Sequence, residues 1–306
     1  MRSLDEVLAT LDAEGKLDGV PFMPEMAAYC GQRFMFGRTA NRVCDEGAGQ
    51  LRRLEDAVFL KDLRCDGSAH DGCQRGCLVL WKKAWLKQPG QPASLAPVAG
   101  SPVISSLSDL KTKVDGRYYC QSTELTSATQ PMSRWDVRPL IADLRNGESS
   151  LRRFVQVIVL TLFNKLSSLL TGRSLSVLIG HAKRTSPGDL DLKTGESVTV
   201  KSREEILSNL TEEGRNKGLS FEYEMLGHCG GDYEVAFPIR KIILEESGQM
   251  IEISNTVALE GVVCSGLLLR DCPRANYLYW REAWLERCAD EGRSAFEGGA
   301  HDDHHG

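Results

Sequence analysis

The chain has 306 residues, of which 42% are hydrophobic and 26% are charged, a composition typical of a soluble globular protein and not of a disordered one. Its formal net charge of −5 argues against a protein that binds the phosphate backbone of nucleic acid with its whole surface, so no nucleic-acid partner is expected. The start of the chain is charged and amphipathic and has neither the apolar region nor the cleavage site of a secretory signal peptide. This predicts a cytoplasmic protein. In a reducing compartment, ten cysteines indicate metal binding or redox chemistry rather than disulfides.

The chain repeats itself at an offset of 199 residues. Residues 3–87 align without a gap on residues 202–286, with 25 identities over 85 positions. A match of this length indicates a tandem duplication, and we expect the two copies to fold alike. The predicted organisation is a first Cys-containing repeat (1–90), a linker and helical middle region (91–194), a second Cys-containing repeat (195–290) and a disordered tail (291–306).

Each copy begins with a Ser-x-x-Glu box that predicts a short helix, because the two side chains cap free backbone N–H groups. The boxes are Ser3 with Glu6 and Ser202 with Glu205. In the second copy, "YEVAFPIRKIIL" and "QMIEISNTVALEGVVC" predict strands joined by tight turns, and "GESVTVKS" (195–202) predicts a strand before the helix. The predicted fold class is mainly β, within α+β: tandem SH3-like small barrels, each with a capping helix, joined by a partly helical middle region. The first copy lacks the strand before Ser3, so either another segment replaces it or the first barrel is incomplete.

The middle region begins with a linker rich in Pro, Gly, Ser and Ala, "QPGQPASLAPVAGSP". Residues 149–172 predict a helix whose apolar core is about eleven residues long, shorter than the ~20 residues that span a bilayer. The favoured interpretation is a helix packed across both barrels. Peripheral membrane contact or partner docking through residues 149–172, flanked by Arg152, Arg153 and Lys165, is the alternative.

Three cysteines occupy equivalent positions in both copies, and strand pairing could bring each trio to one end of a barrel. Converging thiolates suit Zn²⁺, at distances of ~2.3 Å, or an iron–sulfur cluster. A metal ion, with zinc favoured and an iron–sulfur cluster as the alternative, is therefore the expected cofactor. The predicted metal ligands are Cys30, Cys65, His70, Cys73 and Cys77 in the first copy and Cys229, Cys264 and Cys272 in the second, with Cys44 and His228 as further candidates for the fourth ligand.

Other chemistry-bearing residues have simpler expected roles. Cys120 and Cys288 are expected to be unpaired packing residues. Trp81 and Trp85 lie four residues apart and are expected in the core on one helical face. Glu25 and Glu224 are matched carboxylates expected to accept hydrogen bonds, with general-base catalysis as the alternative. The sequence contains no phosphate loop, zincin helix, serine nucleophile elbow or dinucleotide fingerprint, so the catalytic residues remain unassigned.

Two functions fit these observations. The first is a metal-stabilised binding or accessory module in a biosynthetic pathway, in which metal substitutes for core that a small barrel cannot supply, and which takes a protein or small-molecule partner. The second is a metalloenzyme or iron–sulfur redox protein with its centre in the first repeat, where the extra ligands Cys44, His70 and Cys77 lie.

The segments "DGVPFMPEM", "RCDGSAHDGCQRGC" and "LEGVVC…CPRANYLYWREAWLER" carry a resemblance to a family of bacterial hypothetical proteins with duplicated Cys-containing, SH3-like repeats. The resemblance covers nearly the full chain and implies the same duplicated layout. It implies no activity and no catalytic residues.

Overall fold

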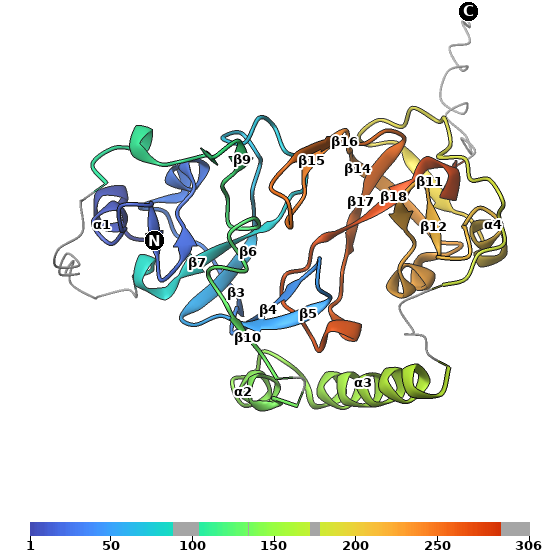
Figure 1. The fold of residues 1–306 in the computed structure, drawn as a ribbon, viewed down its shortest axis with the longest axis horizontal. Coiled ribbons are helices and arrows are strands. Elements are labelled where there is room, and N and C mark those ends of the chain that lie inside the picture. Colours follow the sequence, from blue (N-terminus) through green and yellow to red (C-terminus); the bar gives the residue numbers. More distant parts are fainter. Residues whose placement is uncertain (88–103, 134, 172–177, 289–306) are drawn as a thin grey trace, which may run out of the picture.

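The structure is a computed structural model, and it describes residues 1–87, 104–133, 135–171 and 178–288. The predicted linker segment (88–102) and the predicted tail (291–306) lie outside these ranges. The described chain is a mixed α+β protein of small antiparallel sheets, with the two copies at opposite ends and a long helix below them (Figure 1).

Every element of the first copy has a counterpart in the second, in the same order, as the duplication predicts. Seven elements of the first copy recur in the second with both ends displaced by 199 residues, among them the long strands β6 and β17. The first copy contains α1 (Leu4–Leu8), β1 (Lys16–Leu17), β2 (Val20–Pro21), η1 (Pro24–Tyr29), β3 (Phe36–Thr39), β4 (Arg42–Asp45), β5 (Gln50–Arg53), β6 (Ala57–Arg64), β7 (Leu78–Lys82) and η2 (Lys83–Trp85).

The middle region and the second copy complete the described chain. The middle region contains η3 (Leu107–Asp109), β8 (Lys113–Val114), β9 (Arg117–Tyr118), β10 (Gln130–Pro131), α2 (Arg138–Arg145) and α3 (Leu151–Thr171). The second copy contains β11 (Ser197–Val200), α4 (Arg203–Leu207), β12 (Arg215–Asn216), β13 (Leu219–Ser220), η4 (Tyr223–His228), β14 (Asp232–Pro238), β15 (Lys241–Ile243), β16 (Met250–Glu252), β17 (Thr256–Val263), η5 (Leu267–Leu269), β18 (Tyr277–Arg281), η6 (Glu282–Trp284) and β19 (Leu285–Arg287).

Both predicted capping boxes are present. The Glu6 carboxylate accepts the Ser3 backbone N–H at 2.9 Å, and Glu205 accepts that of Ser202 at 3.0 Å. These bonds satisfy N–H groups that a helix of only five residues would otherwise leave unpaired. The short helices of the two copies therefore start where the sequence predicts.

The second copy forms a half-barrel of five strands in the order β18-β17-β14-β11-β19. The predicted extra strand is β11, which pairs with both β14 and β19. In the first copy, β3, β6 and β7 form a sheet of three strands. There Arg2 donates its backbone N–H to Trp85 O, as Lys201, directly after β11, does to Trp284 O in the second copy. Among the described residues, the first copy therefore has no strand equivalent to β11 and keeps only the hydrogen bond that follows it.

Each copy builds its own hydrophobic core around a pair of tryptophans. Trp81 and Trp85 are fully buried in the first copy, as are Trp280 and Trp284 in the second. The expectation that these residues lie in the core is confirmed, but the shared helical face is wrong. Trp81 lies on β7 and Trp85 in the following 3₁₀ turn, because the segment pairs with β6 as a strand.

The two copies exchange hairpins across their interface. The backbone N–H of Cys44, on β4, donates to Cys272 Sγ at 3.2 Å. The backbone N–H of Ile243, the equivalent residue on β15, donates to Cys73 Sγ at 3.3 Å. Each hairpin thus docks on the cysteine loop of the other copy, and the two matched thiols act as hydrogen-bond acceptors for the exchanged strands.

Charged residues support the same interface with approximate twofold symmetry. Arg75 donates to Ile243 O at 3.1 Å, and its equivalent Arg274 donates to Cys44 O at 2.6 Å. Both guanidinium groups also contact Glu245, and Arg75 pairs with the equivalent carboxylate, Glu46. Only 8% of each arginine side chain is exposed. Because water cannot solvate these buried guanidinium groups, the carboxylates of Glu46 and Glu245 must balance their charge.

The helix predicted at residues 149–172 is α3, but it does not pack across both copies. It contacts η5 and α2 and lies below the second copy (Figure 1). Its window Leu151–Leu170 has a mean hydropathy of 1.3, only 6% of the window is buried, and by length and composition it could cross a membrane. The interpretation of α3 as a packed helix is therefore wrong, and so is the estimate that its apolar run is too short.

Candidate metal centre

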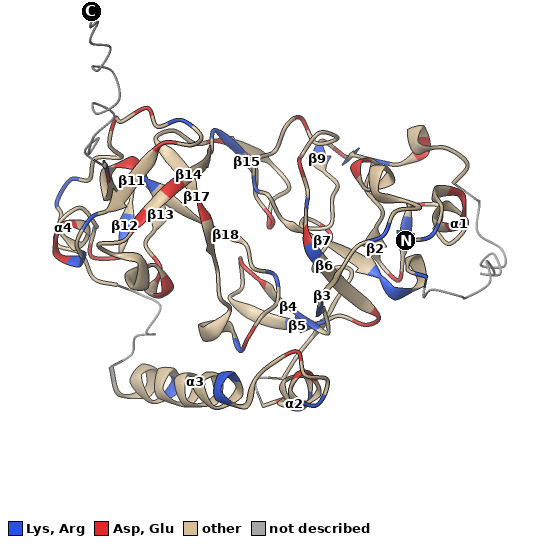
Figure 2. Ribbon diagram, turned by 180° about the vertical axis from the view of Figure 1, so that it is seen from behind, with Lys and Arg blue, Asp and Glu red and all other residues tan. Residues whose placement is uncertain are grey.

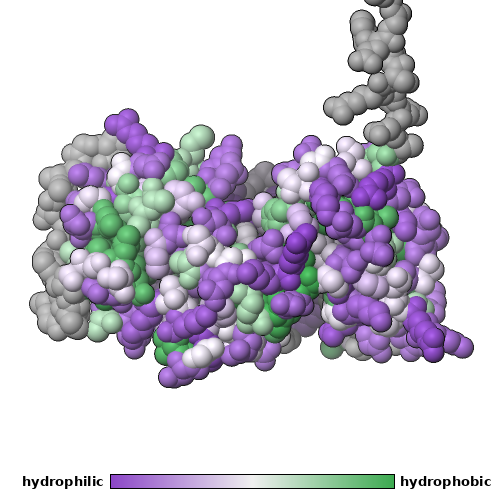
Figure 3. Space-filling model, turned by 90° about the horizontal axis from the view of Figure 1, so that it is seen from above, coloured by the Kyte–Doolittle hydropathy of each residue, from purple (hydrophilic) through white to green (hydrophobic). Residues whose placement is uncertain are grey.

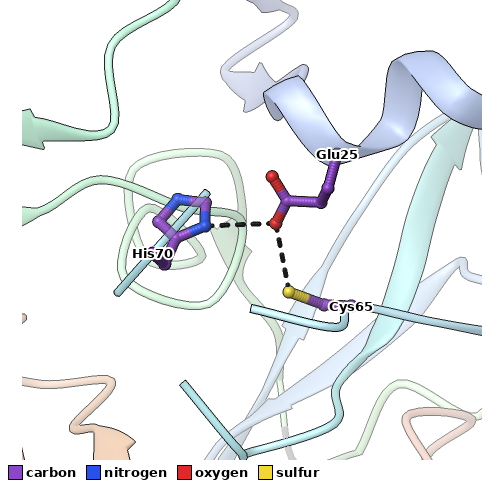
Figure 4. Close-up of side chains that lie close together, drawn as sticks. All are labelled: Glu25, Cys65 and His70. Atoms are coloured by element: carbon purple, nitrogen blue, oxygen red, sulfur yellow. Dashed lines mark hydrogen bonds and ion pairs between the residues drawn. The ribbon is translucent and has the colours of Figure 1, made fainter. Parts of the chain in front are cut away.

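Three side chains from separate elements of the first copy meet at one point (Figure 4). Glu25 lies on η1, Cys65 directly follows β6, and His70 lies in the loop between β6 and β7. One ligand atom from each of the three lies within 4.8 Å of the others. Among the described residues, this group has the composition and spacing to hold a metal ion.

The loop that carries Cys65 and His70 is tightly folded around a glycine. Gly67 has a φ of +70°, and a Cβ at this position would lie 2.1 Å from Cys73 O. Any other residue would have to displace the backbone of the loop. The backbone N–H of Cys65 closes the loop by donating to Cys77 O at 2.8 Å.

The tautomer of His70 is fixed by the middle region. Nε2 lies 3.0 Å from the backbone oxygen of Tyr119, which can only accept, so Nε2 carries a proton. Nδ1 then faces Glu25 Oε1 at 3.1 Å. A backbone carbonyl that holds the outer nitrogen is the arrangement that orients histidine ligands in metal sites.

Glu25 is the centre of the group and is only 4% exposed. Its Oε1 accepts from His70 and from the Cys65 thiol, which lies at 3.2 Å. Its Oε2 is buried and has no hydrogen-bond partner among the described residues. Since buried carboxylate oxygens are normally satisfied, Oε2 is an acceptor left unpaired at this group, whereas Oε1 is the oxygen that faces the other two side chains (Figure 4).

The three groups shift one another's proton affinity. Burial raises the pKa of Cys65, and the Glu25 charge raises it further, so the thiol is protonated. Burial is the largest single effect and opposes the charges of His70 and Glu25, but their mutual hydrogen bond and charge attraction, with further hydrogen bonds, together outweigh it. The pKa of His70 is raised as a result and that of Glu25 is lowered.

A divalent cation fits this charge balance. At pH values between the lowered pKa of Glu25 and the raised pKa of His70, a protonated His70, an ionised Glu25 and a neutral Cys65 sum to zero charge without metal. If a divalent cation replaces the protons on His70 Nδ1 and Cys65 Sγ, the sum is again zero. The exchange therefore adds no net charge to a buried site, where uncompensated charge is costly.

The same geometry argues against a cysteine nucleophile. A thiol–histidine catalytic pair needs the imidazole to accept the thiol proton. Here the thiol of Cys65 donates to Glu25 instead, and its pKa is raised. Reactive cysteines have a lowered pKa, so the group suits metal binding better than nucleophilic catalysis.

Other predicted ligands line a small cavity beside this group. The cavity has a volume of about 40 Å³, and a volume of this order can hold a water-sized ligand. Its lining includes Cys65, His70, Cys73, Cys77 and Cys120. Cys73 and Cys77 therefore lie near the group, although neither belongs to the set of atoms within 4.8 Å.

The remaining predicted ligands lie elsewhere. Cys30 packs against the first core, with its Sγ 3.9 Å from Met26 O. Cys229 and Cys264 pack against the second core. Cys44 and Cys272 meet at the interface between the copies.

The other candidate for the fourth ligand also has a local partner. His228 lies with its Nδ1 2.7 Å from the Tyr233 hydroxyl. Cys120 is free and buried in the first core, as expected of a packing residue.

The second copy keeps two of the three residues and lacks the third. Glu224 and Cys264 are the counterparts of Glu25 and Cys65, but Leu269 stands where the first copy has His70. Glu224 instead accepts the Ser265 backbone N–H at 2.6 Å. The duplication therefore provides a natural counterpart of the site that lacks the histidine.

Comparison with protein-family models, with curated proteins and with solved structures finds no match to this chain. The function of the group is therefore inferred from its own geometry. Glu25 is not among the ligands predicted from the sequence, although its identity with Glu224 beside matched cysteines is a signal. The contact between η1 and the loop after β6, which brings Glu25 to the group, has no local sequence pattern.

Proposed function

We propose that the chain is a metal-binding module of two duplicated, SH3-like copies, of which the first holds one divalent metal ion, with zinc as the favoured ion. Glu25, Cys65 and His70 are the proposed ligands. The observation that carries the proposal is the convergence of a carboxylate, a thiol and an imidazole within 4.8 Å of one another, with Oε1 of Glu25 facing both other groups and Oε2 buried without a partner. Oxygen, nitrogen and sulfur donors are all ligands that zinc accepts.

The proposed role of the metal is to hold together parts of the chain that are far apart in sequence. Its ligands join η1 to the loop after β6, and the backbone of Tyr119 ties the middle region to His70. Cys73, in the same loop, receives the hairpin of the second copy. A metal at this point would stabilise the surface by which the two copies meet, as expected of a binding or accessory module.

A metalloenzyme is the second candidate. Three protein ligands leave one position open on a tetrahedral ion, which is the pattern of catalytic zinc sites. A cavity of about 40 Å³ beside the ligands would admit a water molecule or a ligand of similar size. Binding of cyanide to the Co²⁺-loaded protein, seen as a change in its visible spectrum, would favour this candidate.

Zinc titration of the reduced protein tests the proposal. We expect one Zn²⁺ per chain, with an affinity that rises with pH because metal competes with protons. The rise should approach about a hundredfold per pH unit below the His70 pKa, where two protons are displaced, and about tenfold above it, where one is displaced.

The matched variant for this titration is His70→Leu, because the second copy carries Leu269 in the same loop. We expect it to fold and to bind zinc at least roughly a hundredfold more weakly. Unchanged zinc affinity in His70→Leu, or an affinity independent of pH, would contradict the proposed site.

A further inference from the structure

The outer face of α3 carries an apolar stripe that the described protein does not cover. Eight apolar side chains of this helix are at least half exposed, which is the opposite of the usual burial of an apolar helix face. They are Leu151, Val155, Val159, Leu162, Phe163, Leu166, Leu169 and Leu170, with exposed fractions from 50% to 76%.

The opposite face of α3 is the one that contacts the protein. Val157 is fully buried, and Arg153 donates from Nε to Asp271 Oδ1 at 3.0 Å. Asp271 belongs to the loop of the second copy that α3 covers. The helix is thus fixed by an ion pair and a narrow contact, and its apolar stripe faces outward. The side of the molecule away from α3, seen from above in Figure 3, shows hydrophilic and hydrophobic residues interspersed.

The charged side chains of the helix itself are of one sign. The helix has no Asp or Glu, and its ribbon shows blue segments but no red ones (Figure 2). Arg152 and Lys165 are exposed on it. The three carboxylates of the preceding segment bind within the protein: Asp136 to Arg53 and Arg138, Asp143 to Arg38 and Arg42, and Glu148 to Thr39.

An aromatic side chain lies beside the cations. Trp135 is 68% exposed, and the Lys165 ammonium lies 3.7 Å from the centre of its ring. Tryptophan and lysine at the edge of an apolar helix face are typical of the interface between a bilayer and water.

We propose that α3 docks on the surface of a bilayer that contains anionic lipid, with its apolar stripe in the acyl region and Arg152 and Lys165 among the headgroups. A second copy of the chain fits less well. A pair of α3 helices would bring cations together without a carboxylate on either helix to compensate them. Anionic headgroups supply that compensation.

Vesicle co-sedimentation of the full chain tests the proposal. We expect binding to vesicles of phosphatidylglycerol and phosphatidylcholine, and weaker binding to phosphatidylcholine alone. Leu162→Glu with Leu166→Glu should lower the partition coefficient by roughly tenfold or more, because two apolar contacts with the bilayer are lost.

The matched control is Gln156→Glu with Ser168→Glu, which adds the same charge at exposed polar positions of the same helix. We expect this control to retain more binding than the leucine variant. Two results would overturn the proposal: no binding of the unmodified protein to anionic vesicles, or equal loss of binding in the two variants. A dimer that dissociates in the leucine variant, without vesicle binding, would assign the stripe to a second copy instead.

Discussion

Replacing Cys65 with serine is expected to abolish stoichiometric zinc binding, whereas replacing Cys264 with serine leaves it intact. Both cysteines follow a long strand at equivalent positions, and both side chains are largely withdrawn from solvent, so their pKa values are raised. Only Cys65 has an imidazole and a shared carboxylate beside it. Loss of one of three ligands should weaken binding by roughly a hundredfold or more, measured by competition with a chromophoric chelator.

The melting temperature with and without zinc provides the control for this pair. Zinc should raise the melting temperature of Cys264→Ser as it does that of the unmodified protein, because ligand binding to the folded state stabilises it. It should leave that of Cys65→Ser nearly unchanged. Equal loss of zinc binding in both variants would mean that the two copies hold equivalent sites.

Replacing Asp143 with alanine is expected to destabilise the fold by about 3–5 kcal/mol, the usual effect of removing one partner of a buried ion pair. Asp143 is 1% exposed and binds Arg42, equally buried, at 2.8 Å. Arg42 also donates to the backbone oxygen of Asp271 at 2.8 Å. The pair therefore links α2 to both copies, and its loss leaves the Arg42 guanidinium without its nearest carboxylate. Urea unfolding measures the change.

The control for this substitution is Arg138→Ala on the same helix. The Arg138 side chain is 76% exposed and pairs with Asp136 at 2.8 Å. Because Arg138 is exposed and Asp136 keeps a second partner in Arg53, we expect the loss of the Arg138 side chain to cost about 0–1 kcal/mol. If Asp143→Ala changed the free energy of unfolding no more than Arg138→Ala does, the buried ion pair between Asp143 and Arg42 would not contribute to stability.

The duplication made much of the fold predictable from the sequence. The capping boxes at Ser3 and Ser202, and the strand before Ser202, depend on local patterns that one sequence displays. The exchange of hairpins does not. It depends on long-range contacts between Cys44 and Cys272 and between Ile243 and Cys73, which no local pattern reports.

The matched cysteines illustrate the same limit at the site. The identity of Cys73 with Cys272 predicts a metal ligand in each copy, yet in the structure both thiols accept a backbone N–H from the other copy. A buried thiol at an interface is sufficient reason for the match. His70 is informative because it is not matched, and Glu25 completes the group through a contact between segments 40 residues apart.

X-ray absorption spectroscopy of the zinc-loaded protein identifies the ligands of the proposed site, because it reports which atoms bind the metal. We expect one sulfur at ~2.3 Å and at least two nitrogen or oxygen atoms at ~2.0–2.2 Å, from Cys65, His70 and Glu25. Three or four sulfur ligands would contradict the proposed site, since the metal would then be held by the thiols that line the neighbouring cavity.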